Sequence, residues 1–111
     1  MKLLLDECVD QLLRHHLTGH KVETVGFRRW NGVKNGELLG RAAKAGFDAL
    51  VTTDRRMPSQ QNSETLPLSV VVIASASNDF EDIIPLIPNL LAALPTLSPR
   101  SVTFIEPATP R

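Results

Sequence analysis

The sequence predicts a three-layer α/β/α sandwich built on a mainly parallel sheet. Short apolar runs rich in β-branched residues alternate with segments of helical periodicity along the 111 residues. Strands separated by crossover helices pair in parallel, with the helices covering both faces of the sheet. No repeat or linker divides the chain, so we expect one domain over residues 1–106 and a disordered tail over residues 107–111.

The first half of the chain contains three predicted strands and two predicted helices. The strands are short apolar runs at Lys2–Asp6, Lys21–Gly26 and Ala49–Thr53. The first helix spans Val9–Leu17, where apolar residues recur at helical spacing before Gly19. The second helix starts at Asn35, a favourable N-cap, and ends at Gly46. Between them, Phe27–Lys34 is rich in arginine and contains an Asn-Gly pair, so we predict a loop.

The second half contains two strands and one helical segment interrupted by prolines. The polar segment Arg55–Pro67 is predicted to be a loop. Helical apolar spacing recurs over Asp79–Leu94, but Pro85 and Pro88 each remove a backbone donor from it. The helix therefore either begins near Asp82 or is kinked. The two strands are Leu68–Ala74 and Ser101–Ile105.

Composition predicts a soluble globular protein and excludes several classes. The twelve Lys and Arg balance the twelve Asp and Glu, and 42% of the residues are hydrophobic. No apolar run approaches the ~20 residues of a membrane span, so we expect no membrane partner. The run Lys2–Leu5 is too short for the core of a signal peptide, and we expect a cytoplasmic protein. A single cysteine, Cys8, excludes an internal disulfide framework.

Three carboxylates follow strands or begin a helix at one predicted edge of the sheet. Asp6 ends the first strand, Asp54 follows the third, and Glu37 lies in the first turn of the second helix. Ligands of open parallel sheets bind beyond the carboxyl ends of the strands, where the strand order reverses. If the first and third strands are neighbours, the three acids share one cleft and repel one another unless a cation is bound. Oxygen ligands of this kind suit Mg²⁺ or Mn²⁺, which activate water for phosphodiester hydrolysis.

Structural roles also account for these residue types. Asp6 and Asp54 suit strand-end turns, where carboxylates accept hydrogen bonds from main-chain amides. Glu37 suits the amino-terminal turn of any helix, because a negative charge there interacts favourably with the helix dipole. Cys8 suits a small packing position. The histidines lack a metalloprotease pattern and are interpreted as surface residues: His15, His16 and His20.

Three stretches of the sequence together carry a resemblance: residues 1–8, residues 21–25 and residues 34–54, the last of which ends in Thr-Thr-Asp. The chain resembles the short PIN-like family of small bacterial proteins, which is related to VapC-type toxin ribonucleases. The resemblance covers about residues 1–75 and includes the Gln60-Gln61-Asn62 segment. It implies a PIN-type fold, acids that bind a divalent metal and cleave RNA, and a toxin with a cognate antitoxin protein.

The resemblance also assigns residues to the site. Asp6 matches the first acid of the family, and Asp54 matches the acid that ends the Thr-Thr-Asp strand. The acid implied at the start of the second helix falls on the amide Asn35, so Glu37 is the candidate replacement. The candidate catalytic and metal-binding residues are therefore Asp6, Glu37 and Asp54. Further polar candidates for the site are Asn35, Gln61 and Asn62.

Cations and aromatic residues in two segments suggest contacts to RNA. Phosphate contacts and base stacking are the means by which proteins hold single strands. Phe27 precedes the first group of candidates, which is Arg28, Arg29 and Trp30. Arg55 and Arg56 directly follow Asp54, where they can reach a bound phosphate or pair with the acids. The alternative is that the aromatic residues anchor the loop while the arginines are solvated.

The leading hypothesis is a divalent-metal-dependent ribonuclease that acts on RNA, the toxin of a toxin–antitoxin pair. The alternative is a PIN-like module that binds RNA or a protein partner without cleavage, because Asn35 replaces an acid. A flavodoxin-like receiver module also gathers acids at a sheet edge, but it needs a lysine after a late strand, and residues 57–111 contain none. The apolar stretch Ile83–Leu97 fits either core packing or a homodimer interface.

Overall fold

The computed structural model describes residues 1–58 and 65–107, so Gln61, Asn62 and tail residues 108–111 lie outside the described part. Five strands form a single sheet: β1 (Lys2–Leu5), β2 (Lys21–Thr24), β3 (Ala49–Thr52), β4 (Ser69–Ile73) and β5 (Val102–Ile105). The α-helices are α1 (Asn35–Lys44), α2 (Phe80–Ile83) and α3 (Ile87–Ala93). Short 3₁₀ segments are η1 (Gln11–His16), η3 (Ile84–Leu86) and η4 (Leu94–Thr96). No helix of the described residues is long and apolar enough to cross a bilayer.

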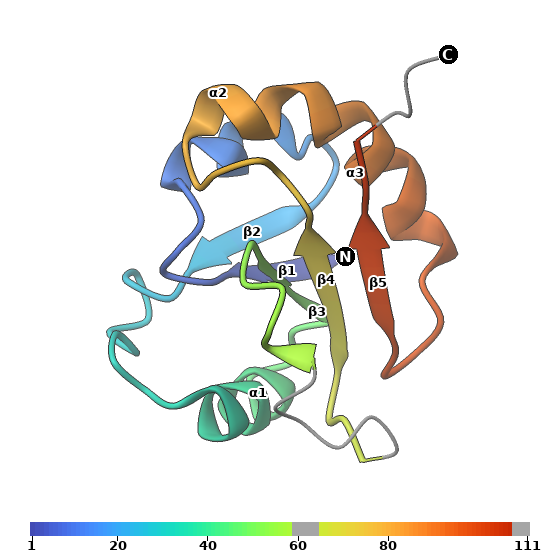
Figure 1. The fold of residues 1–111 in the computed structure, drawn as a ribbon. Helices are drawn as coiled ribbons and strands as arrows, with labels where there is room; N and C mark the ends of the chain where they lie inside the picture. The colour runs from blue at the N-terminus through green and yellow to red at the C-terminus, as the bar shows by residue number, and fades with distance from the viewer. Residues whose placement is uncertain (59–64, 108–111) are drawn as a thin grey trace.

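The sheet has the strand order β2-β1-β3-β4-β5, and every neighbouring pair is parallel (Figure 1). The chain builds outward from β1 to β2, returns across β1 to form β3, and then continues through β4 to β5. The direction of building therefore reverses between β1 and β3, which is the topological switch point of this doubly wound order. The prediction of a mainly parallel α/β sheet is confirmed, and β1 and β3 are neighbours as the predicted site requires.

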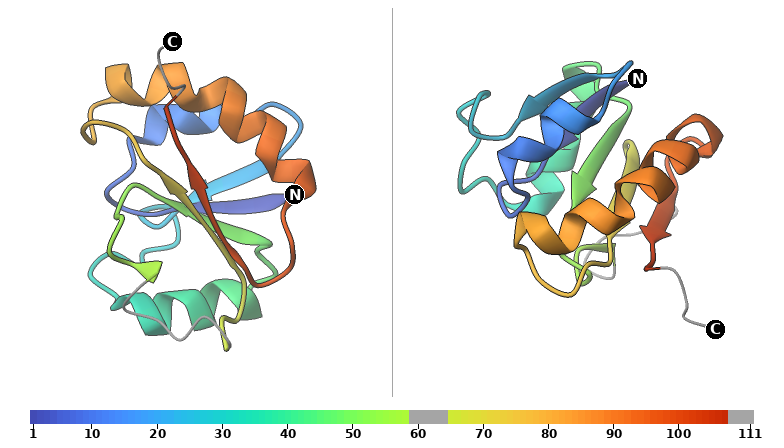
Figure 2. Two further views of the ribbon diagram at one scale, coloured as in Figure 1. Left: turned by 45° about the vertical axis from the view of Figure 1, so that its right-hand side comes forward. Right: turned by 90° about the horizontal axis from the view of Figure 1, so that it is seen from above.

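Helices cover both faces of the sheet (Figures 1 and 2). Strand residues alternate between the two faces, so Leu3 and Leu5 point to one side of β1 and Leu4 points to the other. The first side packs against η1 and the α2–α3 segment, and the second packs against α1. Most residues of β1, β3 and β4 are fully buried, because both of their faces are covered. The three-layer arrangement predicted from the sequence is therefore confirmed.

Two predicted helices differ in detail from the structure. The predicted helix Val9–Leu17 is the shorter 3₁₀ segment η1, which begins after Asp10, whose side chain accepts a hydrogen bond from the Leu12 amide. The predicted helical segment from Asp79 onward is kinked rather than delayed to Asp82, since α2 already begins at Phe80. Three prolines divide it into short segments, each with its proline in the first two positions: Pro85, Pro88 and Pro95. Proline is tolerated there because the backbone N–H that it lacks would have no partner within the first turn of a helix.

The start of α1 also differs from the prediction. Lys34, not Asn35, is the N-cap, with an extended backbone at ψ 149° and a carbonyl that accepts from the Leu38 amide at 2.8 Å. Asn35 is thus the first residue of the helix. The Lys34 side chain makes no capping hydrogen bond to the helix.

Candidate functional site

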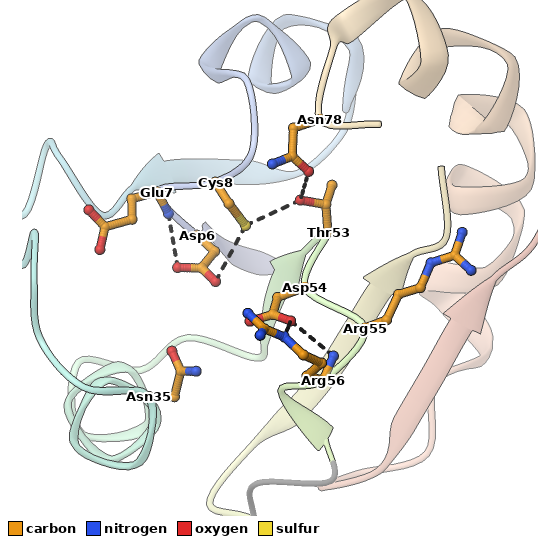
Figure 3. Close-up of a pocket in the computed structure, with 9 residues that line it drawn as sticks. All are labelled: Asp6, Glu7, Cys8, Asn35, Thr53, Asp54, Arg55, Arg56 and Asn78. Carbon is orange, nitrogen blue, oxygen red and sulfur yellow. Dashed lines mark hydrogen bonds and ion pairs between the residues drawn. The ribbon is translucent and has the colours of Figure 1, made fainter. Parts of the chain in front are cut away.

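A pocket of about 470 Å³ lies at the carboxyl ends of β1 and β3, the switch point of the sheet (Figure 3). It is open on one side, and polar side chains dominate its lining. Nine residues line it: Asp6, Glu7, Cys8, Asn35, Thr53, Asp54, Arg55, Arg56 and Asn78. They come from the ends of β1, β3 and β4 and from the amino end of α1, so the fold brings together four distant parts of the chain.

Asp6 lines the pocket and is held in place by hydrogen bonds to neighbouring residues. Its amide donates to the Val51 carbonyl at 2.9 Å, which extends the β1–β3 ladder by one residue. Its carboxylate accepts from the Glu7 amide and from the Thr52 hydroxyl, both at 2.9 Å. The residue is only 8% exposed. Each carboxylate oxygen has two acceptor sites, so these bonds orient Asp6 and still leave it acceptor capacity.

Asp54 lies in the turn that follows β3 and lines the same pocket (Figure 3). Its Oδ1 accepts from the Arg56 amide at 2.9 Å, the pattern of an Asx turn, and from Arg56 Nε at 3.3 Å. Its side chain is 27% exposed, against 81% for Arg56. An ion pair this exposed contributes little to stability, roughly 0–1 kcal/mol, and exchanges readily for another partner.

Glu37, in contrast, does not line the pocket, although the sequence places it with the two aspartates. Successive helical residues are about 100° apart around the axis, so Asn35 and Glu37 point in nearly opposite directions. Asn35 lines the pocket, while Glu37 pairs with Arg41 one turn later at 3.3 Å and is 62% exposed. The prediction that three carboxylates share the cleft is therefore wrong for Glu37.

Among residues 1–58 and 65–107, no group of three or more His, Cys, Asp and Glu side chains is placed to hold a metal ion. The pocket nevertheless offers the carboxylates of Asp6 and Asp54 and the amide of Asn35. Mg²⁺ commonly takes only one or two protein carboxylates and completes its octahedron with waters and substrate phosphate. The donor set thus fits a hard divalent cation that is coordinated mainly by water.

The arginines predicted to contact RNA have different surroundings. Arg55 donates through Nη2 to the Ala74 and Ser75 carbonyls at 3.0 and 3.1 Å, so its guanidinium ties the turn to the end of β4 and points away from the aspartates (Figure 3). Arg56 stays beside Asp54 at the pocket. Arg29 is exposed on the loop between β2 and α1.

Arg28 has a structural role. Its Nε and Nη2 donate to the two carboxylate oxygens of Glu23 at 2.9 and 3.0 Å, a bidentate pair. These bonds hold the pKa of Glu23 below its ordinary value of 4.5, and the charges of Arg28, Lys2 and Lys21 add to the effect while partial burial opposes it. The guanidinium also lies 5.5 Å from the centre of the Trp30 ring. Arg28 and Trp30 thus anchor the loop, as the alternative interpretation of this segment predicts for its aromatic residues.

Four pocket residues are absent from the site predicted from the sequence: Glu7, Cys8, Thr53 and Asn78. Thr53 donates to Asn78 Oδ1 at 2.8 Å, which joins the end of β3 to the segment after β4. The Cys8 sulfur lies 3.2 Å from the Thr53 hydroxyl and 3.7 Å from Asp6 Oδ2. The sequence gives a signal for Thr53 and Cys8, because Thr53 precedes Asp54 and Cys8 lies two positions after Asp6. The signal for Asn78 is weaker, because it lies in the segment between β4 and α2 and not directly at the end of a strand.

Comparison of the chain with protein-family profiles, with curated proteins and with solved structures finds no significant match.

Proposed function

We propose that this protein is a ribonuclease that depends on a divalent metal, with Asp6 and Asp54 as the metal ligands. The observation that carries the proposal is that these two carboxylates, 48 positions apart in the sequence, line one open pocket at the β1/β3 switch point. Open parallel sheets bind their ligands at this place. The pocket is polar and has the size of a small-ligand site, which suits a nucleotide phosphate with its hydration shell.

The two proposed metal ligands, Asp6 and Asp54, differ in how firmly their surroundings hold them. Asp6 is oriented by two hydrogen bonds of 2.9 Å and is nearly buried, so it is preorganised for a cation. Asp54 is more exposed and is shared with Arg56. Asn35 brings a neutral amide and the amino end of α1 to the same pocket, and the positive end of a helix dipole favours a phosphate.

A bound Mg²⁺ or Mn²⁺ would supply the charge that activates water and stabilises the phosphodiester transition state. The protein would contribute positioning. Arg56 can move from Asp54 to an RNA phosphate, because the pair is exposed and weak. Asp54 would then be without this ion pair and would be one of the two residues that hold the metal.

A second candidate function is a PIN-like module that binds RNA or a protein partner without cleaving RNA. The observation that favours it is that Asn35, an amide, lies in the pocket where the family resemblance implies an acid. Glu37 does not compensate, since it pairs with Arg41. An amide oxygen carries no charge, so this pocket holds a divalent cation less tightly than one with three carboxylates.

RNA cleavage in the presence of Mn²⁺ tests the first proposal. We expect Asp6→Asn and Asp54→Asn each to lower the rate by at least about 100-fold, the upper range for loss of an outer-sphere partner of a metal ligand. The control is Glu81→Gln, the same change of acid to amide at an exposed position in the first turn of α2. Equal rates for the wild type and both aspartate variants would refute the nuclease proposal.

Calorimetric titration with Mn²⁺ separates the two candidates. Saturable binding that Asp6→Asn abolishes supports the metal-dependent nuclease. Absence of such binding, together with retained binding of RNA, supports the non-catalytic module. A toxin role with a cognate antitoxin is an expectation that comes from the resemblance of residues 1–75.

A further inference from the structure

The loop formed by residues 25–34 lies at the same sheet edge as the pocket. It follows β2, which runs parallel to β1, so it leaves the sheet at the edge where Asp6 lies. Glu7 joins the two features: it lines the pocket, and its carboxylate accepts from the Gly32 amide at 3.1 Å and from Asn31 Nδ2 at 3.3 Å. Glu7 therefore connects this loop to the pocket of the proposed cleavage site.

The loop is ordered by its inward-facing residues. Arg28 forms the bidentate pair with Glu23, and Trp30 packs against the core on the α1 side, with its ring 6.4 Å from that of Phe47 in an edge-on arrangement. Main-chain hydrogen bonds connect the loop to itself, among them Arg29 to the Gly26 carbonyl at 3.1 Å and Trp30 to the Val25 carbonyl at 3.0 Å. The aromatic and cationic groups that anchor the loop are thus Trp30 and Arg28.

Two other side chains of the loop face solvent. Phe27 is 71% exposed, the highest value among the exposed large hydrophobic residues of the described chain. Its backbone is held by a 3.0 Å bond from its amide to the Thr24 hydroxyl. Arg29, two positions on, is also exposed and has a φ of 60°, a left-handed conformation that is uncommon outside glycine.

A single exposed hydrophobic residue is ordinary on a protein surface. Phe27, however, lies two positions before the exposed Arg29 on the same loop. Trp30 already packs the loop against the core, so Phe27 is not required for this contact. Main-chain hydrogen bonds hold the loop on both sides of Phe27. The Phe27 amide donates to the Thr24 hydroxyl, and the Arg28 amide donates to the Thr24 carbonyl. Phe27 and Arg29 are exposed two positions apart on the loop, and an aromatic ring and a cation are the two groups that bind an unpaired base and its phosphate.

We propose that Phe27 and Arg29 form a nucleotide-binding subsite beside the pocket: Phe27 stacks on an unpaired base, and Arg29 binds a neighbouring phosphate of the same strand. This inference rests on the proposed function for the choice of nucleic acid as the ligand. It divides the Phe27-Arg28-Arg29-Trp30 cluster into two outward-facing ligand-binding residues and two inward-facing anchors. Because stacking on Phe27 needs an unpaired base, the subsite selects single-stranded RNA over duplex.

The test is the affinity of the intact protein for a fluorescently labelled twelve-nucleotide oligouridine, measured by anisotropy in EDTA so that no metal-dependent cleavage occurs. Phe27→Ala is expected to weaken binding by at least about fivefold, the lower range for loss of one stacked base. Phe27→Trp is expected to retain the affinity, because it keeps an aromatic face. Arg29→Ala is expected to reduce the slope of log affinity against log salt by about 0.7, the value for one phosphate contact on a single strand.

Two matched controls lie elsewhere on the molecule. Phe104, 45% exposed on β5, is the control for Phe27, and Phe104→Ala is expected to leave the affinity unchanged within twofold. Arg100, exposed and with a φ of 52°, is the control for Arg29. It precedes β5, and therefore lies at the opposite edge of the parallel sheet from the pocket, so Arg100→Ala should leave the salt slope unchanged.

The subsite is refuted if the wild type does not bind the oligouridine, or if Phe27→Ala and Phe104→Ala have equal effects. Equal loss of affinity for the single strand and for a duplex on Phe27→Ala also contradicts it. These outcomes are distinguishable from failure of the nuclease proposal, because binding is measured without metal. Loss of binding on Phe27→Ala in a protein that does not cleave RNA supports the subsite within the non-catalytic module.

Discussion

The hydroxyl of Thr52 donates a hydrogen bond of 2.9 Å to the carboxylate of Asp6. The parallel register pairs Leu5 with Val51, so the next residues, Asp6 and Thr52, lie side by side. Thr52 is completely buried, and its hydroxyl also accepts from the Asp54 amide at 3.1 Å. One buried hydroxyl thus connects the two acids of the candidate site, although they follow different strands.

Replacing this hydroxyl is therefore expected to affect both acids. Thr52→Val keeps the shape of the side chain but leaves the Asp54 amide without its acceptor, and we expect a loss of about 1–3 kcal/mol in the free energy of unfolding. Thr52→Ser restores the hydroxyl and should recover most of the loss. Urea unfolding of the three proteins measures the difference, and equal destabilisation by valine and serine would indicate a packing effect alone.

Removing Arg56 is expected to strengthen binding of a cation at the pocket. Arg56→Ala takes away the positive charge that pairs with Asp54 at 3.3 Å, so Asp54 becomes available to Mn²⁺. Stability should change by less than about 1 kcal/mol, because the pair is exposed. Calorimetry should give a lower Kd for Mn²⁺ than in the wild type, and a raised Kd would exclude competition between Arg56 and the metal.

Glu37→Gln is expected to leave the binding of Mn²⁺ unchanged. The Glu37 carboxylate is committed to Arg41 on the face of α1 that points away from Asn35. Loss of this exposed i,i+4 pair should cost about 0.2–0.5 kcal/mol of stability. The same titration, with Asp6→Asn as the variant that loses binding, measures the outcome; an equal loss for Glu37→Gln would place its carboxylate in the metal site.

The Glu23–Arg28 pair is expected to make stability depend on pH. Because hydrogen bonds from Arg28 lower the pKa of Glu23 below 4.5, the folded protein binds the proton more weakly than the unfolded chain does. The stabilisation is complete above pH 4.5 and is lost as the pH falls through the lower pKa of the folded state. Glu23→Gln should therefore destabilise the protein more at pH 7 than at pH 3. Urea unfolding at both values tests this, and a difference independent of pH would contradict it.

Much of the architecture follows from the sequence because it depends on local patterns. Each predicted strand is present, with bounds that differ by no more than two residues, since short apolar runs between turn signals specify buried strands. The positions of Asp6 and Asp54 follow equally, because a residue after a parallel strand lies at the carboxyl edge of the sheet. The prolines after Asp79 predict an interrupted helix, which the structure confirms.

Other features depended on neighbours that the sequence does not name. The sequence does not show that Glu23 accepts both guanidinium bonds of Arg28, or that Arg55 donates to the carbonyls at the end of β4. Asn35 rather than Glu37 lines the pocket because the packing of α1 on the sheet sets which side of the helix faces it. In each case a charged side chain could pair with any of several partners at a similar free energy. The sequence alone does not determine which partner it meets.

By itself, the sequence determined the alternation of strands and helices, the parallel sheet and the two acids at one edge, because hydrophobic periodicity acts over a few residues and leaves few alternatives. Only the tertiary structure decided that Asn35 rather than Glu37 meets those acids, and that Phe27 rather than Trp30 faces solvent. Such choices depend on the packing of α1 and of the 25–34 loop against distant strands. Side chains of similar chemistry compete for those positions, and the shape of the assembled core determines which of them is buried.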